Sequence, residues 1–454
     1  MKHSWLKSVF PIAAIFSFRM LGLFMLIPVF TLFATDLKGA TPVLIGLALG
    51  GYGLSQGILQ IPFGIMSDRF GRKPILRIGL LLFVCGSLMG ALSHSIYTMI
   101  FARTLQGTGA IGSVLIALLA DLTPDEHRTK AMAVIGMTIG LSFGLAMVVS
   151  PVLTHYYGLS GIFYLTTFLA LLALLLLERA IPTPQKERFH PDSEASPSLF
   201  KGVLKNKHLQ RLNAGIFFQH FILTATFFVI PMLLQEQVKE GYLAQQWYFY
   251  LPLMLFSFVL MIPFILMAEK KRQMKLVFFM AVFVTCISQW VLALTSHHWL
   301  SLWVLMFFYF VAFNILEATL PSLVSKQAQL TAKGTAMGVY SSCQFLGIFA
   351  GGVAAGLIFQ LAGSTGIFIC NGLISLVWLM LAFFMKPEVY LSTLILSYPT
   401  SVKDEKTLII ELKSLRGLKD AVIAKEEGVI YLRVDKANYI PGSSENILSD
   451  SHLY

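Results

Sequence analysis

Long apolar stretches separated by short polar loops dominate the first 386 residues of the chain. Twelve of these stretches reach the length of about 20 residues that an α-helix needs to cross a bilayer core. They cover residues 8–33, 43–66, 75–93, 96–120, 131–153, 160–178, 212–234, 247–268, 276–295, 299–323, 336–361 and 365–386. The first stretch is too long for a signal peptide, and no small-residue cleavage site follows it. The pattern therefore predicts an all-α polytopic membrane protein with twelve transmembrane helices.

A polar connector and a charged tail divide this pattern. The connector, residues 179–211, is rich in proline, and its part 198–211 is expected to form a short basic amphipathic helix on the inner membrane face. We therefore expect six-helix bundles at 1–178 and 212–386. In the tail, residues 387–454, the periodicities follow the order β-α-β-β with a weakly helical or disordered end. This order predicts a small α/β ferredoxin-like domain without its last strand.

The two expected bundles share short sequence features at nearly one spacing. The loops at 68–73 and 269–272 begin 201 positions apart, and each carries an acidic residue followed by basic ones. The pair Ala131-Met132 opens the fifth stretch, and Ala336-Met337 opens the eleventh, 205 positions later. Chance similarity between apolar segments does not explain the charged loop. We therefore expect a duplicated six-helix unit, which is the layout of many secondary transporters.

The charge of the chain agrees with a membrane body. Only 13% of the 454 residues are charged, whereas soluble domains have roughly 25%; a soluble enzyme, a disordered protein and a disulfide-rich secreted domain are excluded. The net charge of +11 divides into +13 for residues 1–386 and −2 for the tail. In the body, 22 Lys and Arg fall in loops of one side, while Lys38 and Lys239 fall on the other. The positive-inside rule therefore places both ends of the body in the cytoplasm, without any need for nucleic acid.

The loop after the second stretch resembles the signature loop of the major facilitator superfamily. The matching residues are Gly64, Asp68, Arg69, Gly71, Arg72 and Lys73. Gly64 would allow a neighbouring helix to approach closely, and Asp68 would be stabilised by the positive end of a helix. The resemblance implies that this helix is the eleventh and that Arg72 pairs with Asp121 at the end of the fourth stretch. It further implies a cytoplasmic latch that opens when these charges exchange partners.

Two further stretches are similar to motifs of the same superfamily. Residues 103–110 resemble its fourth-helix motif, in which the arginine, here Arg103, is linked to proton transfer in relatives; a buried hydrogen-bonding anchor is the alternative. Residues 136–151 resemble a degraded form of the glycine-rich signature of drug–proton antiporters. Ser150 stands where that signature has glycine before Pro151, which weakens the implication of antiport.

Few ionisable or polar groups fall in the middle of the apolar stretches. The ionisable ones are Arg19, Arg103, His220 and Glu317. Burial disfavours a charged carboxylate, so Glu317 could take up and release a proton near neutral pH, as could His220; a structural hydrogen bond is the alternative for both. Arg19 keeps its proton, so we expect it to orient a cavity partner or an anionic group. Asn314 and Gln344 would add polar groups to an apolar cavity suited to an amphipathic compound.

These features predict a secondary active transporter, with proton-coupled efflux of a small amphipathic organic compound by antiport and alternating access. A proton symporter and a sensor built on the transporter fold, with the tail as its output, stay open as alternatives. No nucleotide-binding GxxxxGK[ST] motif and no paired acids for metal–phosphate binding occur, so neither a pump nor a membrane transferase is expected. The protein is thus expected not to be an enzyme and to need no cofactor.

The expected surroundings and partners follow from the same features. The four cysteines lie inside apolar stretches without a CxxC pair, so neither a metal site nor a disulfide framework is expected. The expected partners are a small-molecule substrate, protons and the lipid bilayer. We expect a multi-pass monomer of a bacterial inner membrane, with both termini in the cytoplasm. The tail is expected to regulate the protein or to mediate self-association, unless it is a plain stabilising appendage.

Overall fold

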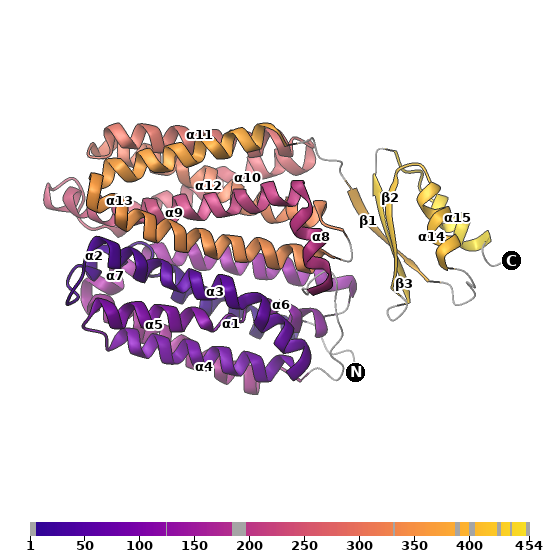
Figure 1. Ribbon diagram of the computed structural model, residues 1–454, viewed down its shortest axis with the longest axis horizontal. Helices are drawn as coiled ribbons and strands as arrows, with labels where there is room; N and C mark the ends of the chain where they lie inside the picture. Colours follow the sequence, from indigo (N-terminus) through magenta and orange to yellow (C-terminus); the bar gives the residue numbers. More distant parts are fainter. Residues whose placement is uncertain are drawn as a thin grey trace.

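Long apolar helices lying side by side make up most of the structure, and a small unit with a sheet lies beyond one end of them (Figure 1). The structure is a computed structural model. It describes residues 6–123, 125–183, 197–329, 332–385, 391–398, 405–424, 428–435 and 438–450. Within these ranges, ten helices are long and apolar enough to cross a membrane.

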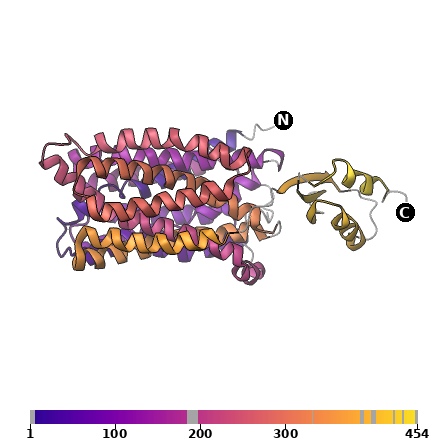
Figure 2. The ribbon, with the colours of Figure 1, turned by 90° about the horizontal axis from the view of Figure 1, so that it is seen from above.

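The helices of the body form two groups that lie next to each other in Figure 1. In Figure 2, which is seen from above, the second group lies in front of the first. The first group contains α1 (Leu6–Phe24), α2 (Phe30–Ala34), α3 (Pro42–Phe70), α4 (Arg72–Ala91), α5 (Ile96–Thr108), α6 (Gly112–Asp121) and α7 (Asp125–Arg179). The second group contains α8 (Phe200–Lys205), α9 (Lys207–Lys239), α10 (Trp247–Lys270), α11 (Met274–Thr295), α12 (Trp299–Gln327) and α13 (Lys333–Phe383). A 3₁₀ turn, Pro197–Leu199, precedes α8.

Four residues with positive φ occupy equivalent positions in the two halves of the body. The two longest helices, α7 and α13, each contain one non-helical glycine, Gly158 (φ 61°, ψ −167°) and Gly363 (φ 62°, ψ −157°). These glycines lie 205 positions apart and divide each helix into two passes, so the body has twelve passes as predicted. Positive φ also occurs at Gly71 and Arg272, 201 positions apart, in the loops after α3 and α10. The two spacings are those of the sequence matches, as expected for pseudo-symmetric halves.

Two passes differ from the continuous helices that the apolar pattern predicts. The first pass, expected over 8–33, breaks after Phe24, and a turn containing Pro28 leads into α2. Proline has no N–H group for the helical hydrogen-bond ladder, which accounts for a break here. The fourth pass breaks between α5 and α6 at Gly109, where an added Cβ would lie 2.4 Å from the carbonyl oxygen of Gly79. The backbones are too close there for a side chain.

The connector helix is shorter than expected. The sequence predicts one amphipathic helix within 198–211, but α8 ends at Lys205 and α9 already begins at Lys207. Asn206 separates them because its extended backbone ends α8 and its side chain accepts a hydrogen bond from the N–H of His208 at 3.0 Å. This is an N-cap, which starts a new helix. Residues 184–196 of the connector lie outside the described residues.

Glycines bring α3 of the first half into backbone contact with α13 of the second. A Cβ added at Gly46 would lie 2.2 Å from the carbonyl oxygen of Gly352, and one added at Gly356 would lie 2.4 Å from that of Pro42. Such approach needs residues without side chains, as in other membrane helix pairs. On α3 these contacts lie at the start of the helix, which follows α2 at the end of the bundle remote from the tail (Figure 1). The two halves are therefore in backbone contact along the first part of α3.

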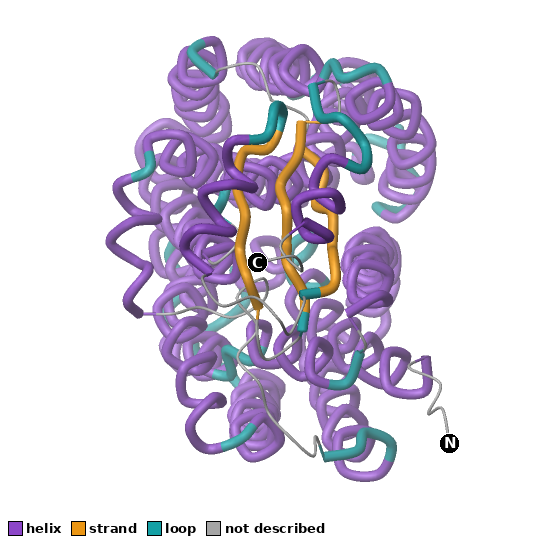
Figure 3. The backbone as a smooth tube through the Cα atoms, turned by 90° about the vertical axis from the view of Figure 1, so that its right-hand side faces the viewer, coloured by secondary structure: helices purple, strands orange, loops and turns teal. Residues whose placement is uncertain are grey.

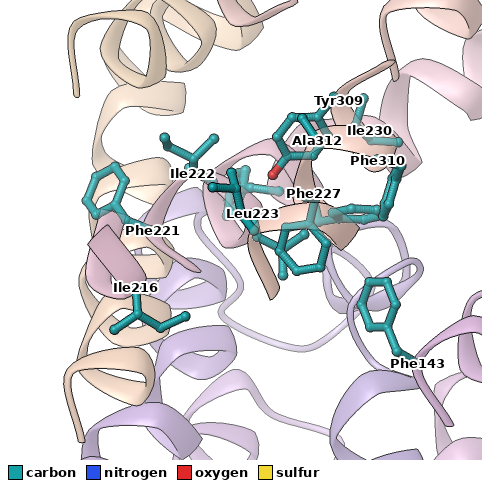
Figure 4. Close-up of a cluster of buried hydrophobic side chains, with 14 of the residues drawn as sticks. Phe143, Ile216, Phe221, Ile222, Leu223, Phe227, Ile230, Tyr309, Phe310 and Ala312 are labelled. Atoms are coloured by element: carbon teal, nitrogen blue, oxygen red, sulfur yellow. The ribbon is translucent and has the colours of Figure 1, made fainter. Parts of the chain in front are cut away.

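Aromatic rings add a second contact between the halves. The ring of Phe143 on α7 lies 6.2 Å from that of Phe310 and 5.7 Å from that of Phe313, both on α12. Figure 4 shows Phe143 beside the cluster that contains Phe227 and Phe310. Offset and edge-on rings at these distances attract one another beyond the burial of their area. The seam between the halves is thus apolar and aromatic around α12.

The tail is a three-stranded antiparallel sheet with two helices on one face. Its elements are β1 (Leu391–Ser397), α14 (Glu405–Ser414), β2 (Leu418–Ala424), β3 (Val429–Asp435) and α15 (Ser443–Asp450), and the strand order is β1-β3-β2. Leu412, Ile430 and Leu432 are buried in its core. In Figure 3 the two helices cover the face of the sheet that points away from the body. Within the segment 436–454, expected to be weakly helical or disordered, residues 443–450 form α15.

One side chain on the other face of the sheet joins the tail to the body. Arg433 follows Leu432 on β3 and therefore points to the opposite face. Its guanidinium donates hydrogen bonds to the carbonyl oxygens of Ser325, Lys326 and Ala328 at the end of α12. The last carbonyls of a helix have no partner within it and carry partial negative charge, which a cation satisfies. The tail is thus docked on the end of α12.

We predict that Gly46→Ala lowers the melting temperature of the purified protein in detergent. The added methyl group would overlap the carbonyl oxygen of Gly352, and overpacking of this kind costs about 1–3 kcal/mol. Gly140→Ala is the matched control, since a Cβ at Gly140 meets nothing within 4 Å. Its melting temperature should stay the same or rise. Equal melting temperatures for the two variants would contradict the backbone contact.

Candidate functional site

A sharp turn between α3 and α4 positions the charged loop. Gly71 takes φ 94° and ψ 150°, a conformation that side chains disfavour. Its N–H donates to the carbonyl oxygen of Ser67 at 3.0 Å, which ends α3. Because α4 begins at the next residue, Arg72 lies beside the last turn of α3. The turn therefore requires the glycine that the sequence carries.

Arg72 is the centre of this loop. Its side chain is 1% exposed, and its Nε donates to Oδ2 of Asp121, whose side chain is 0% exposed, at 3.1 Å. Its Nη1 donates to Oγ of Ser67 at 2.8 Å and to Oδ1 of Asp68. The structure thus brings together Arg72 and Asp121 from α4 and α6. A buried charge of this kind is tolerated because opposite charges and hydrogen bonds surround it.

Asp68 does not contact the helix that the family resemblance assigns to it. Its side chain is 33% exposed, and its described ion pair is with Arg72 of the same half. No hydrogen bond or ion pair among the described residues joins Asp68 to α13. The expected contact with the eleventh helix is therefore not present here. It would require the ends of α3 and α13 to approach at the side of the tail.

The other loop residues have simpler surroundings. Arg69 stacks over the ring of Phe70, with its Cζ 5.4 Å from the ring centroid. Lys73 is half-buried in the first turn of α4. Gly64 faces Ser113 of α6, whose Oγ would lie 3.3 Å from an added Cβ. Gly64 therefore permits close packing with the fourth pass of its own half.

The second half has a charged counterpart of this loop. Lys326 on α12 donates to Oε1 and Oε2 of Glu269, at the end of α10, at 3.0 and 3.1 Å. Glu269 lies 201 positions after Asp68, and Lys326 lies 205 positions after Asp121. The pair is half-exposed, whereas Arg72 is buried. The two halves thus place ion pairs at equivalent helix ends. The residues at 68 and 269 are both acidic, the sign is reversed between Asp121 and Lys326, and the pair of the second half is less buried.

In the middle of the first half, two arginines meet one tyrosine. Arg19 on α1 donates from Nη2 to the hydroxyl of Tyr52 at 3.1 Å and also to Oε1 of Gln56. The guanidinium of Arg103, on α5, lies over the ring of Tyr52, 5.0 Å from its centroid. Arg103 also donates to Oε1 of Gln106 at 2.8 Å. Both arginine side chains are almost wholly buried.

In the middle of the second half, Glu317 lies among three hydrogen-bonding side chains. Its Oε2 accepts from Nε2 of Gln219 at 3.0 Å and lies 3.9 Å from Nε2 of His220. The amide of Gln344, on α13, donates to the same His220 nitrogen at 2.9 Å. Residues of α9, α12 and α13 therefore meet here. The cluster combines one carboxyl, one imidazole and two amides.

Asn314 is not part of this cluster. Its side-chain amide donates to Oγ of Ser257 on α10 at 3.1 Å. It therefore links α12 to α10, away from Glu317. The sequence places Asn314 and Glu317 on one helix and leaves open which neighbouring helix each side chain meets.

A buried polar network in the second half is not predicted from the sequence. Nδ2 of Asn371 donates to Oγ1 of Thr226 and to Oε1 of Gln289, both at 3.1 Å. The network ties together α9, α11 and α13. The side-chain amides inside apolar stretches are the sequence signal for this network, because lipid hydrocarbon offers an amide no hydrogen-bond partner and the amides must therefore bond to other helices.

No group of three or more His, Cys, Asp or Glu side chains suited to a metal ion occurs among the described residues. The four cysteines, which lie in the described ranges, are free thiols. The site is therefore built from ion pairs, amides and aromatic rings. Its two parts are the charged loop at the end of the bundle near the tail and the polar groups in the middle of the passes.

Comparison with known families decides the class of the protein. A sequence model described as Major Facilitator Superfamily matches residues 12–352. The chain belongs to the major facilitator superfamily. It is therefore a membrane transporter of a small-molecule substrate and not an enzyme.

Relatives and a solved structure support this assignment. The chain is 40% identical to the inner membrane transport protein YajR of Escherichia coli (strain K12), over 94% of each chain. It is 36% identical to an uncharacterized transporter of Buchnera aphidicola subsp. Acyrthosiphon pisum (strain APS), over 74% of this chain and 86% of that one. The E. coli xylose transporter XylE, in a partially occluded inward open conformation, superposes with a TM-score of 0.63 at 14% identity. That superposition covers 84% of this chain and 98% of XylE, and it shows the fold alone.

In this transporter we predict that Arg72→Gln strongly lowers the melting temperature in detergent. The change removes the arginine that faces the buried carboxylate of Asp121, and breaking a buried pair costs about 3–5 kcal/mol. Arg77→Gln is the matched control, because the pair of Arg77 with Glu178 is exposed and such pairs contribute little. Similar melting temperatures for the two variants would show that the buried cluster is not a stabilising element.

Proposed function

We propose that this transporter exports a small amphipathic organic compound in exchange for protons, by alternating access. The observation that carries the proposal is the position of Glu317. It is the one acidic residue in the sequence that lies away from the ends of the passes. Intramembrane carboxyls that face partners inside a bundle mark ion and proton pathways. Glu317 is therefore assigned as the coupling residue.

The partners of Glu317 suit both of its protonation states. As a carboxylate it accepts the hydrogen bond from Gln219. Oε1 of Gln219 is buried without a hydrogen-bond partner, so it offers an acceptor to a protonated Glu317. The Glu317 side chain is 36% exposed, so the bundle does not enclose it on all sides.

His220 is placed to assist Glu317. Its Nδ1 lies 3.3 Å from the carbonyl oxygen of Ile216, which accepts a hydrogen bond only if Nδ1 carries the hydrogen. Its Nε2 then accepts from Gln344. This arrangement fits a neutral imidazole. Nε2 faces Glu317 at 3.9 Å, so a proton can pass between the two groups after a small movement.

We further propose that the described conformation is open toward the cytoplasm and that the charged loop is a latch. The halves are in backbone contact at the end remote from the tail, through Gly46 and Gly352. At the opposite end Asp68 faces Arg72 and not α13. The charge asymmetry of the loops supports a cytoplasmic position of that end. When it closes, Asp68 would reach the positive end of α13.

The alternatives differ in what moves across the membrane. A symporter would carry protons in the same direction as the substrate, and a sensor would move neither. The docking of Arg433 on α12 supports a regulatory tail, which a sensor would also need. Purified protein in vesicles with an imposed pH gradient separates the three. Substrate uptake into acid-loaded, inside-out vesicles with loss of lumenal protons supports antiport.

The cellular arrangement belongs to the same proposal. The chain would act as a monomer in a bacterial inner membrane, with both termini in the cytoplasm; YajR is named an inner membrane transport protein. The proposed units are bundles at 1–178 and 212–386, a connector at 179–211 and a tail domain at 387–454.

We predict that Glu317→Gln abolishes exchange driven by a pH gradient and preserves exchange of substrate for substrate. The amide keeps the shape of a protonated carboxyl and cannot release a proton. Radiolabelled substrate flux in proteoliposomes measures both activities. Glu269→Gln is the control, since Glu269 is exposed and pairs with Lys326 at the membrane edge. Persistent pH-driven exchange in Glu317→Gln would remove Glu317 as the coupling residue.

We also predict that Asp68→Asn slows transport severely without lowering the melting temperature. Asp68 is partly exposed, and Arg72 keeps its second carboxylate, Asp121. The substitution would therefore destabilise the closed latch and leave the stability of the described conformation unchanged. Asp36→Asn, in an exposed loop at the other end, is the control. Normal transport in Asp68→Asn would rule out the latch.

A further inference from the structure

Two buried cations in the middle of the first half have no anionic partner among the residues that the structure describes. The side chains of Arg19 and Arg103 are each 2% exposed. Among the described residues neither forms an ion pair with a carboxylate. Nε and Nη1 of Arg19 and Nε of Arg103 are buried without any hydrogen-bond partner. The partners that do exist are neutral groups.

The contrast with Arg72 shows that this chain can neutralise a buried arginine. Arg72 is equally buried, yet it faces two carboxylates, Asp68 and Asp121. A charge removed from water without compensation costs several kcal/mol. Buried charges are therefore paired in folded proteins. The uncompensated state of Arg19 and Arg103 points to a partner of opposite charge that does not belong to the chain.

A helix end adds to the positive character of this region. Nη1 of Arg19 lies 3.4 Å from the Cβ position of Gly112, the first residue of α6. The first N–H groups of a helix have no partner within it. They give that end a partial positive charge that attracts anions. In transporters, helices broken in the middle of the membrane present such ends to anionic groups of substrates.

The cations lie at the seam between the halves, where a transported compound would bind. Tyr52, which contacts both arginines, faces the ring of Phe345 on α13 at 6.3 Å between centroids. The residue before Phe345 is Gln344, which contacts His220 of the Glu317 cluster. The positive groups and the proposed proton site therefore flank the same turn of α13.

We propose that the transported compound is an organic anion, whose acidic head group binds Arg19, Arg103 and the start of α6. The guanidinium donors suit a carboxylate or a sulfonate, which can accept two parallel hydrogen bonds. The apolar body of the compound would lie against the aromatic seam formed by Phe143, Phe310 and Phe313. This inference rests on the proposed transport function and adds the charge of the substrate to it.

The test compares one charged probe with its neutral counterpart. Naphthalene-2-sulfonate stays ionised at all working pH values, and naphthalene-2-sulfonamide has nearly the same shape without the charge. Binding to the purified full-length protein is measured by calorimetry and by thermal shift in detergent, at constant ionic strength. The sulfonate should bind and raise the melting temperature, whereas the sulfonamide should not.

Arginine variants locate the binding. Arg19→Gln should raise the half-saturating concentration of the sulfonate roughly tenfold or more, because hydrogen bonds to charged groups are the stronger ones. Arg19→Lys keeps the charge and should lose less. Arg77→Gln, an exposed arginine, should bind as the wild type. The melting temperature of ligand-free Arg19→Gln should be no lower than that of the wild type, since the change removes an uncompensated charge. A clear fall would make Arg19 a structural anchor and overturn the proposal.

Other outcomes separate this inference from the proposed function. Equal binding of the sulfonate and the sulfonamide would overturn the organic-anion proposal, and so would stabilisation by chloride that the sulfonate cannot displace. If neutral or cationic compounds exchange for protons in vesicles while organic anions do not, the anion inference falls and the exchange function stands. If the sulfonate binds through Arg19 and crosses the membrane without any response to pH, the anion site stands and proton coupling falls.

Discussion

The cost of placing charge in an apolar environment governs the structure. A buried ion loses several kcal/mol of hydration unless opposite charges or hydrogen bonds replace it. The chain meets this cost in different ways at different places. Arg72 is surrounded by two carboxylates and a hydroxyl, and Arg433 uses helix-end carbonyls. Only neutral partners face Arg19 and Arg103 among the described residues, so this is where an external anion is needed.

Hydropathy made the fold predictable because each pass must satisfy its backbone internally and present apolar side chains to lipid. The pattern of apolar and polar residues along the sequence is sufficient to predict the twelve passes, the duplication and the order of the tail elements. Helix breaks are harder to predict, because whether Pro28 or Gly109 interrupts its helix depends on the backbone that packs around it. The partner of Asn314 depends on how α12 is rotated about its axis relative to its neighbours. A helix that is apolar on all its faces gives no sequence pattern that fixes this rotation. In the proposed latch, the partner of Asp68 would depend on the conformation of the transporter, which a sequence does not specify.

The duplicated halves have diverged most in their charges. The first half has the buried ion cluster around Arg72, and the second has the exposed pair of Glu269 and Lys326 at equivalent positions. In the middle of the passes the first half carries two cations and the second carries one carboxyl. Equivalent helices thus supply groups of opposite sign to the seam. In the proposed function, that division of sign would allow one half to hold an anion while the other exchanges a proton.

Helix α12 connects three of these features. It carries Glu317 in its middle, Lys326 near its end, and the carbonyls that accept from Arg433. Eight residues separate Glu317 from Ser325, which is about 12 Å of helix at 1.5 Å per residue. Because a helix of this length moves as a rigid element, any shift of α12 during the proposed proton exchange would also move the carbonyls that hold the tail. The tail therefore either travels with α12 or releases Arg433, and in both cases the tail contact adds to the energy difference between the two states of the transporter.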